Sequence, residues 1–234
     1  MSEMEPFLGF ARQVWKFFIP VAVVTLLVAL WNPFVAIVPA IIAVYILYFF
    51  RDPNRRLPGI PNSISSPADG KVASVLEVPC DDFPDGRARR VAIFLNIFNV
   101  HVQRAPVGGK VYRVDKREGK CMNALNEKCS EENEAVTIWI ESEYGPMGVR
   151  QLSGAIARRI ICKAKTGDTV ERGDRYGIIQ FGSRVEIFLP LSANVKVQPG
   201  QKVTGGETCL AVLFEEEVRK GLSKDKLAKI ALSA

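Results

Sequence analysis

The chain has 234 residues and a formal net charge of +6, so it is long enough for one or two domains and basic enough to lie against an anionic partner. The basic residues are scattered, and no stretch interleaves them with aromatic residues or follows a helix-turn-helix pattern, which excludes nucleic acid as the expected partner and favours anionic lipid. The five cysteines are odd in number and lack CxxC spacing, and there is one histidine, so we expect reduced thiols and no metal site.

Residues 17–50 contain no charged side chain. One continuous helix over this stretch would be about 50 Å long at about 1.5 Å per residue, well beyond the roughly 30 Å of a bilayer's hydrocarbon core. The pair Asn32-Pro33 suits a turn, because proline interrupts a helix. We therefore expect two apolar helices, over about 17–31 and 34–50, joined as a hairpin.

Charges at the two ends of this segment set its expected orientation. The flanking basic residues are Arg12, Lys16, Arg51, Arg55 and Arg56. Basic flanks favour the cytoplasmic side, so both ends are expected at the cytoplasmic face of the cell (inner) membrane. Three forms stay open: a hairpin that spans the bilayer, one that dips partway into it, and one buried inside a soluble protein. Residues 1–16 would be a short lead to the hairpin, amphipathic or not.

From residue 51 onward, short β-branched runs alternate with Gly, Pro and Asp turns, which predicts a mainly antiparallel β domain over 51–234. The expected strands are residues 71–78, 90–98, 110–114, 135–140, 149–152, 178–180, 184–189 and 208–214. A helical turn or two is expected over 155–161, and a polar helix or frayed tail over 215–232.

Two pairs of segments repeat within this domain. Residues 67–75 echo 106–114, and residues 167–174 echo 200–207; each is a turn that feeds a strand. This texture is typical of a quasi-symmetric antiparallel β sandwich built from half-motifs of the biotinyl or lipoyl kind. A membrane-tethered, non-catalytic lipoyl-like binding module is therefore one interpretation. Such a carrier needs a modifiable lysine at a hairpin tip, where this chain has Phe-Gly-Ser-Arg at 181–184.

The single histidine, His101, is the first candidate for proton transfer, because its unperturbed pKa of about 6.5 lies near neutrality. It belongs to an apolar run over residues 94–102, which predicts a strand. A half-buried structural histidine is the plainer alternative. An orienting aspartate and an activatable serine would complete a catalytic constellation, and residues 66–70 (SPADG) and 180–185 (QFGSRV) offer them.

The pair Gly182-Ser183 has the chemistry to cleave its own peptide bond. Glycine lacks a Cβ, so it tolerates a strained backbone and lets a nucleophile approach its carbonyl. The Ser183 hydroxyl can attack that carbonyl once a base removes its proton, giving an ester in place of the amide. β-Elimination then splits the chain and leaves a dehydroalanine, which hydrolyses to a pyruvoyl group. An ordinary glycine-serine turn is the alternative.

Five segments of the soluble part and the end of the apolar leader carry a family resemblance. They are residues 48–53 (YFFRDP), 66–70 (SPADG), 98–106 (FNVHVQRAP), 130–134 (SEENE), 153–160 (SGAIARRI) and 175–190 (RYGIIQFGSRVEIFLP). In this order the chain resembles the short-form, pyruvoyl-dependent phosphatidylserine decarboxylase proenzymes across its whole soluble part. It departs from longer relatives at Phe98, where they carry a second histidine three residues before the catalytic one.

The resemblance implies a self-cleaving triad of Asp69, His101 and Ser183. In it, Asp69 holds the His101 imidazole in the productive tautomer, and His101 deprotonates Ser183. Cleavage between Gly182 and Ser183 is implied. The implied cofactor is a covalent pyruvoyl group made from Ser183, without a metal or pyridoxal phosphate, and it forms a Schiff base with the serine amine of the substrate.

The implied products are a larger chain, 1–182, and a small pyruvoyl chain, 183–234, that stay together as a heterodimer, with a higher homo-oligomer left open. The implied reaction converts phosphatidylserine to phosphatidylethanolamine and carbon dioxide in phospholipid biosynthesis, with His101 as the natural proton donor to Cα. Archaetidylserine, an ether lipid with the same head group, is an alternative substrate. Arg184 is a candidate for the lipid phosphate, against an ordinary strand-surface arginine.

Overall fold

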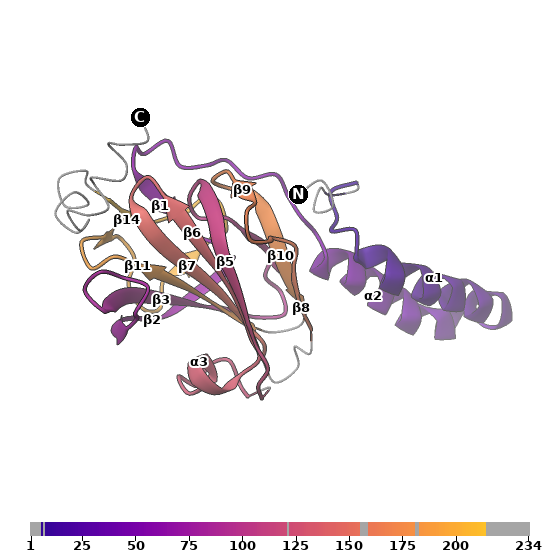
Figure 1. The fold of residues 1–234 in the computed structure, drawn as a ribbon. Coiled ribbons are helices and arrows are strands. Elements are labelled where there is room, and N and C mark those ends of the chain that lie inside the picture. Colours follow the sequence, from indigo (N-terminus) through magenta and orange to yellow (C-terminus); the bar gives the residue numbers. More distant parts are fainter. Residues whose placement is uncertain (1–5, 7, 121, 155–158, 181–182, 214–234) are drawn as a thin grey trace.

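The computed structural model describes residue 6 and residues 8–120, 122–154, 159–180 and 183–213. Two helices lie side by side in an arm that projects from a body of β-strands (Figure 1). They are α1 (Val14–Trp31) and α2 (Pro33–Phe49), which confirms the predicted hairpin. Asn32 separates them: its side-chain oxygen accepts hydrogen bonds from the backbone N–H groups of Phe34 (3.0 Å) and Val35 (3.3 Å) and so caps α2.

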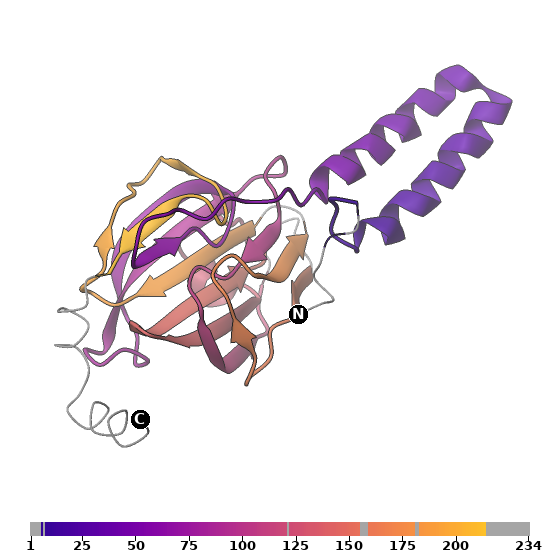
Figure 2. The same ribbon diagram turned by 90° about the horizontal axis from the view of Figure 1, so that it is seen from above.

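The arm leaves most of its apolar side chains uncovered. The view from above shows that it extends away from the strands of the body (Figure 2). Leu30, Trp31 and Phe34 at its tip are 79%, 80% and 82% exposed. Of the described helices, α1 is long and apolar enough to cross a membrane, and α2 is a shorter apolar helix. The arm projects from the body, so the hairpin is not buried inside it. So large an exposed apolar surface is unfavourable in water and is typical of a membrane-associated segment.

The described part of the body contains fourteen strands and one short helix. They are β1 (Ser63–Ser65), β2 (Gly70–Pro79), β3 (Arg87–Leu95), β4 (Val102–Arg104), β5 (Gly109–Arg117), α3 (Cys129–Glu132), β6 (Ala135–Ser142), β7 (Gly145–Leu152), β8 (Arg159–Cys162), β9 (Thr169–Val170), β10 (Arg175–Gln180), β11 (Ser183–Leu189), β12 (Asn194–Val195), β13 (Lys202–Val203) and β14 (Cys209–Val212). An eight-stranded antiparallel sheet has the order β13-β2-β3-β11-β7-β6-β5-β9, and two three-stranded sheets have the orders β1-β14-β12 and β4-β10-β8. The predicted mainly antiparallel β class is confirmed.

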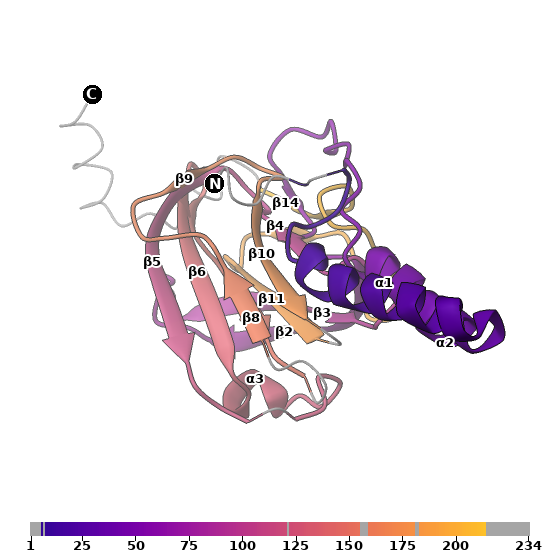
Figure 3. The same ribbon diagram turned by 90° about the vertical axis from the view of Figure 1, so that its right-hand side faces the viewer.

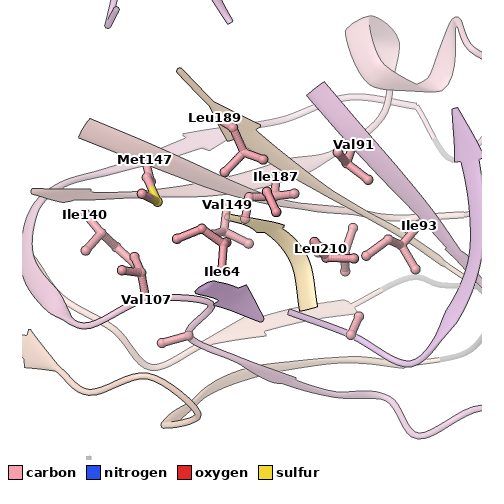
Figure 4. Close-up of a cluster of buried hydrophobic side chains, with 14 of the residues drawn as sticks. Ile64, Val91, Ile93, Val107, Ile140, Met147, Val149, Ile187, Leu189 and Leu210 are labelled. Atoms are coloured by element: carbon pink, nitrogen blue, oxygen red, sulfur yellow. The ribbon is translucent and has the colours of Figure 1, made fainter. Parts of the chain in front are cut away.

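The main core lies between the large sheet and the two small ones. Side chains alternate along β11, so Ile187 and Leu189 enter this core, whereas Phe188 packs in a separate cluster on the opposite face. Figure 4 shows Ile187 and Leu189 in the cluster that also holds Ile64 of β1 and Leu210 of β14. The central strand β11 therefore has one face directed at the inter-sheet core, and this face also carries its first residue.

The internal repeat appears as matching strand pairs at the two ends of the large sheet. Gly70 pairs with Val203 where β2 meets β13, and Gly109 pairs with Val170 where β5 meets β9. At both glycines a Cβ would lie 2.3 Å from a backbone carbonyl oxygen of the neighbouring strand, so the close approach requires glycine. The predicted quasi-symmetry is confirmed.

Two sequence expectations are corrected. The strand expected over 90–98 ends at Leu95, because Asn96 and Asn99 close a turn: the Asn99 side chain accepts from the Asn96 N–H and the Asn96 side chain accepts from the Phe98 N–H, both at 2.9 Å. The helical turn expected over 155–161 is wrong for its end, since residues 159–162 form β8; residues 155–158 lie outside the described residues. The helix or tail expected over 215–232 also lies outside them.

Four of the five cysteines lie among the described residues. Cys80, Cys129, Cys162 and Cys209 are free thiols, and Cys121 lies outside the described residues.

Candidate active site

Ser183 is the first residue of β11, a strand held between β3 and β7. Ser183 lies two residues before Val185, so the two side chains point to the same face of the strand. The Val185 side chain lies in the main core, so Ser183 faces the space between the sheets. Ser183 is fully buried, and its Oγ has no hydrogen-bond partner among the described residues. A buried hydroxyl without a partner is unfavourable in a structural serine, whereas it suits a nucleophile that awaits activation. Gly182 lies outside the described residues.

His101 lies between the turn at 96–99 and β4, and it is fully buried. Its backbone carbonyl accepts a hydrogen bond from the N–H of Ile179 on β10 (3.3 Å). Because β10 runs to Gln180 and β11 begins at Ser183, this pairing brings the histidine backbone beside the segment that leads to the serine. Figure 3 shows β4 and β10 on the side of the body that faces the base of the helical arm.

The imidazole of His101 is held in one tautomer by a backbone group. Its Nδ1 lies 2.9 Å from the carbonyl oxygen of Asn99, and a carbonyl only accepts, so Nδ1 carries the proton. Nε2 is then the atom with the free lone pair, and it is buried without a partner among the described residues. Burial lowers the pKa of His101 from 6.5 to about 4, against the raising effect of the Asn99 hydrogen bond and with a small lowering by Arg51. At neutral pH the ring is therefore uncharged and can accept a proton at Nε2.

Asp69 has partners other than the histidine. Arg55 donates to both of its carboxylate oxygens, at 3.0 and 2.8 Å, and the N–H of Gly205 donates to one of them at 2.7 Å. The loop that carries Asp69 does run beside β4, because the N–H of Arg104 donates to the carbonyl of Pro67 at 2.9 Å. The structure thus brings the three predicted residues to neighbouring segments. It assigns the tautomer-setting contact to Asn99, and a part for Asp69 in cleavage stays a prediction.

A pair of buried glutamines, which the sequence reasoning missed, ties the histidine segment to the sheet that holds Ser183. Gln151 on β7 donates to the side chain of Gln103 on β4 at 2.9 Å, and Gln103 donates to the backbone carbonyl of His101 at 2.7 Å. Both glutamines are fully buried. A Cβ on Gly177 would lie 2.6 Å from the Gln151 side-chain nitrogen, so this glycine makes room for the pair. The signal in the sequence was a polar residue at an inward position of an apolar strand.

Arg184 points to the opposite face of β11 from Ser183. It is fully buried, and its guanidinium lies 2.9 Å from both carboxylate oxygens of Glu127 and 3.0 Å from Glu186. Glu186 is also fully buried and accepts from the Ser130 hydroxyl at 2.6 Å. Arg184 therefore belongs to an ionic cluster that joins β11 to the α3 region. This geometry gives no support to the prediction that Arg184 binds the lipid phosphate.

The segment that follows the helical arm is locked onto the body by ion pairs, and the sequence reasoning did not assign it that role. Asp52 is 1% exposed and accepts from Arg104 at 2.7 Å and from Arg175 at 2.6 Å. Arg55, three residues later, makes the pair with Asp69 described above. The charged residues directly after the apolar segment were the available signal. These ion pairs fix the base of the arm relative to β4 and β10.

Comparison with known proteins identifies the family. Residues 42–211 match the family model described as phosphatidylserine decarboxylase. Similar proteins, each described as phosphatidylserine decarboxylase proenzyme, come from Burkholderia cenocepacia (strain HI2424), Burkholderia vietnamiensis (strain G4 / LMG 22486) and Burkholderia orbicola (strain MC0-3). Each is 40% identical to this chain over 205 residues, which cover 87% of this chain and 95% of the relative. The resemblance carried by the sequence motifs is confirmed, and the chain belongs to the phosphatidylserine decarboxylase family of carboxy-lyases.

Proposed function

We propose that the chain is a proenzyme that cleaves itself between Gly182 and Ser183 and then decarboxylates phosphatidylserine to phosphatidylethanolamine. The observation that carries the proposal is that two buried atoms, Ser183 Oγ and the unprotonated His101 Nε2, have no hydrogen-bond partner among the described residues, while the His101 backbone pairs with β10 and Ser183 begins β11. Neither atom makes a hydrogen bond to a described residue that would stabilise the fold. Together they supply the nucleophile and the base that the cleavage needs.

In the cleavage, Ser183 Oγ forms a bond to the carbonyl carbon of Gly182 while His101 Nε2 takes the hydroxyl proton. The carbon–nitrogen bond then breaks, and the freed amino group receives that proton, so an ester replaces the amide. A base then takes the Ser183 Cα proton, the Cβ–Oγ bond breaks with formation of the Cα–Cβ double bond, and the carboxylate of Gly182 leaves. The dehydroalanine left behind hydrolyses with loss of ammonia and becomes the pyruvoyl group. A neutral histidine suits the first step, because a charged one could not accept the proton.

The residues at Ser183 fit a covalent pyruvoyl group, because the serine is buried, is flanked by strands on both sides and has no competing hydrogen bond to its side chain from any described residue. The pyruvoyl carbonyl would supply the electron sink for loss of carbon dioxide from the substrate. His101 would hold the proton at Nε2 and deliver it to the substrate Cα. The hydrogen bond from Nδ1 to Asn99 would keep the ring in place as Nε2 gains and loses that proton.

The two chains would remain one folded unit after cleavage. The small chain would contain β11 to β14, and three of these strands pair with strands of the larger chain: β11 with β3 and β7, β13 with β2, and β14 with β1. Separation would break all these ladders and expose the main core, so a stable heterodimer is expected. The exposed apolar arm supports a place at the cytoplasmic face of the cell membrane, where the basic flanks of the hairpin would lie.

The test is a denaturing gel with intact-mass measurement on the purified full chain, followed by carbon dioxide release from phosphatidylserine vesicles. Two fragments of the masses expected for 1–182 and 183–234, the smaller one without a free amino terminus, would support the proposal. A single uncut chain that binds vesicles and releases no carbon dioxide would favour the lipoyl-like binding module. Ester- and ether-linked phosphatidylserine analogues, offered side by side, decide between the two lipid substrates.

A further inference from the structure

The last residue of α2 touches the candidate catalytic histidine. The Phe49 ring stacks on the His101 imidazole, with ring centroids 4.1 Å apart and planes inclined by 28°. Phe49 is 1% exposed, although it is the last residue of α2 and the side chains at the start of that helix are largely exposed. The stack therefore links the helical arm to the ring that we expect to carry the proton.

The base of the arm also holds the backbone that leads into His101. From α2, the Tyr45 hydroxyl donates to the carbonyl of Ile97 at 3.2 Å, and the Tyr48 hydroxyl donates to the carbonyl of Phe98 at 3.2 Å. Arg51, just after the helix, donates to the same Phe98 carbonyl at 2.8 Å. These donors fix the turn whose last member, Asn99, receives the Nδ1–H bond of the histidine.

An apolar cluster surrounds these contacts. It joins Phe49 and Phe50 of the arm to Val100, Val102 and Ile178 of the body. Phe50 is buried to the same 1% in this cluster and stacks on Phe17 at 5.5 Å, while no ring contact joins it to His101 among the described residues. Phe49 and Phe50 thus share one environment and differ in their relation to the histidine.

We propose that Phe49 is a positioning residue for His101: its ring fixes the plane of the imidazole, keeps Nδ1 on the Asn99 carbonyl, and excludes water from the ring. The arm is then part of the active site as well as the membrane anchor. The inference depends on the proposed role of His101 in cleavage. Phe49 has no group that can donate or accept a proton or act as a nucleophile, so it acts only through the histidine ring on which it stacks.

The physical basis is rotation and solvation of the imidazole. A ring that stacks on one face cannot turn about its χ2 bond without losing that contact, and a stacked apolar ring leaves no room for water on that face. Arg51 is the charged group from the arm that acts on the imidazole, and the Asn99 carbonyl lies at Nδ1; the Tyr45 and Tyr48 hydroxyls bond to the carbonyls of the preceding turn. Burial is the main cause that lowers the pKa of His101 to about 4, so removal of the Phe49 ring should raise this pKa towards 6.5.

The experiment compares Phe49→Leu with Phe50→Leu, a matched pair with the same change in side chain inside the same cluster. In the full-length Ser183→Ala chain, which should stay uncut, NMR follows the imidazole through pH 3 to 8; His101 is the sole histidine, so its signal is unambiguous. We expect Phe49→Leu to raise the His101 pKa by about one unit or more and Phe50→Leu to change it by less than about 0.3. With Ser183 intact, cell-free synthesis followed on a gel should show cleavage slowed at least tenfold by Phe49→Leu and less than threefold by Phe50→Leu.

Thermal unfolding of the two Ser183→Ala double variants controls for a general loss of packing, because both should lose similar stability. Equal His101 pKa values and equal cleavage rates in the Phe49 and Phe50 variants would overturn the inference. The His101→Ala variant tests the proposed function separately from the inference about Phe49. Efficient cleavage in that variant would show that His101 is not the base. The NMR comparison would still decide whether Phe49 positions the ring.

Discussion

The Nδ1 atom of His101 donates to the backbone carbonyl of Asn99 at 2.9 Å, so a main-chain group two residues away sets the tautomer of the one histidine in the chain. In many hydrolase triads a carboxylate performs this task, and the sequence motifs assigned it to Asp69. A backbone acceptor fixes the same tautomer without adding a negative charge to the site. Burial keeps the pKa of the imidazole low despite this hydrogen bond, and Nε2 has no partner among the described residues.

Replacement of the nucleophile tests the cleavage site. Ser183→Ala should give one uncut chain without decarboxylase activity, because alanine has no hydroxyl to attack Gly182. The fold should keep its stability within about 1 kcal/mol, since Ser183 Oγ has no hydrogen bond to lose among the described residues. Intact mass and thermal unfolding check both points. Cleavage at the same bond in this variant would refute the assignment.

The Asn99 contact leads to a specific prediction for Asp69. In the uncut Ser183→Ala chain, Asp69→Asn should leave the Nδ1–H tautomer of His101 unchanged in nitrogen NMR, because Asp69 bonds to Arg55 and Gly205. With Ser183 present, the family resemblance predicts that Asp69→Asn slows cleavage by orders of magnitude. Arg55→Gln is the companion variant: an equal slowing there would mean that Asp69 acts through the ion pair alone. A tautomer change in Asp69→Asn would show that Asp69 reaches the histidine directly.

The low pKa of His101 predicts how stability depends on pH. The folded-state pKa of about 4 lies below the unfolded value of 6.5, so the unfolded chain binds the proton first as pH falls. The contribution of the neutral histidine is fully present above pH 6.5 and is lost between pH 6.5 and 4, by at most about 3 kcal/mol. Denaturant unfolding of uncut Ser183→Ala, with and without His101→Gln, should show this extra loss only where the histidine is present. Parallel curves for the two proteins would contradict it.

The ionic cluster behind β11 should matter for folding. Glu186→Gln removes the charge of a fully buried carboxylate that pairs with the fully buried Arg184. This change should destabilise the uncut chain by about 3–5 kcal/mol. Glu127→Gln should cost clearly less, because the Glu127 side chain is 48% exposed and water can replace it. Urea unfolding in the Ser183→Ala background measures both, and a larger loss in Glu127→Gln would reverse our ranking of the two pairs.

The tip of the arm should serve the membrane and not the cleavage. Replacing Leu30, Trp31 and Phe34 together by serine removes apolar side chains that are each about 80% exposed. Cleavage should proceed as in the wild-type chain, since none of the three contacts the body cluster at the base. Sedimentation with anionic vesicles should show weaker binding, and turnover in bilayers should fall more than turnover on short-chain dispersed lipid. An equal fall on both substrates would mean that the tip supports the catalytic body.

The sequence by itself determined the features that depend on local pattern. An uncharged stretch with Asn32-Pro33 near its middle predicts two apolar helices, because a long apolar run favours helices of this kind and the Asn-Pro pair interrupts the run. The short β-branched run over residues 184–189 predicts β11, because such residues favour strands. The repeated segments predict turns that feed strands, and β2 and β5 begin at Gly70 and Gly109 of those segments. The motif around Gly182-Ser183 identifies the family, because its chemistry needs adjacent residues.

Only the tertiary structure decided which polar and aromatic side chains meet. Asp69 turns to Arg55, Gln103 pairs with Gln151, and Phe49 covers His101, although each pair joins segments far apart in the chain or on different sheets. Strand register and the seating of the arm set these contacts, and neither follows from local periodicity. A side chain such as that of Arg184 has the same sequence signature whether it faces a lipid phosphate or a buried carboxylate. In the tertiary structure Arg184 lies on the face of β11 where Glu127 and Glu186 also lie, so it pairs with these carboxylates.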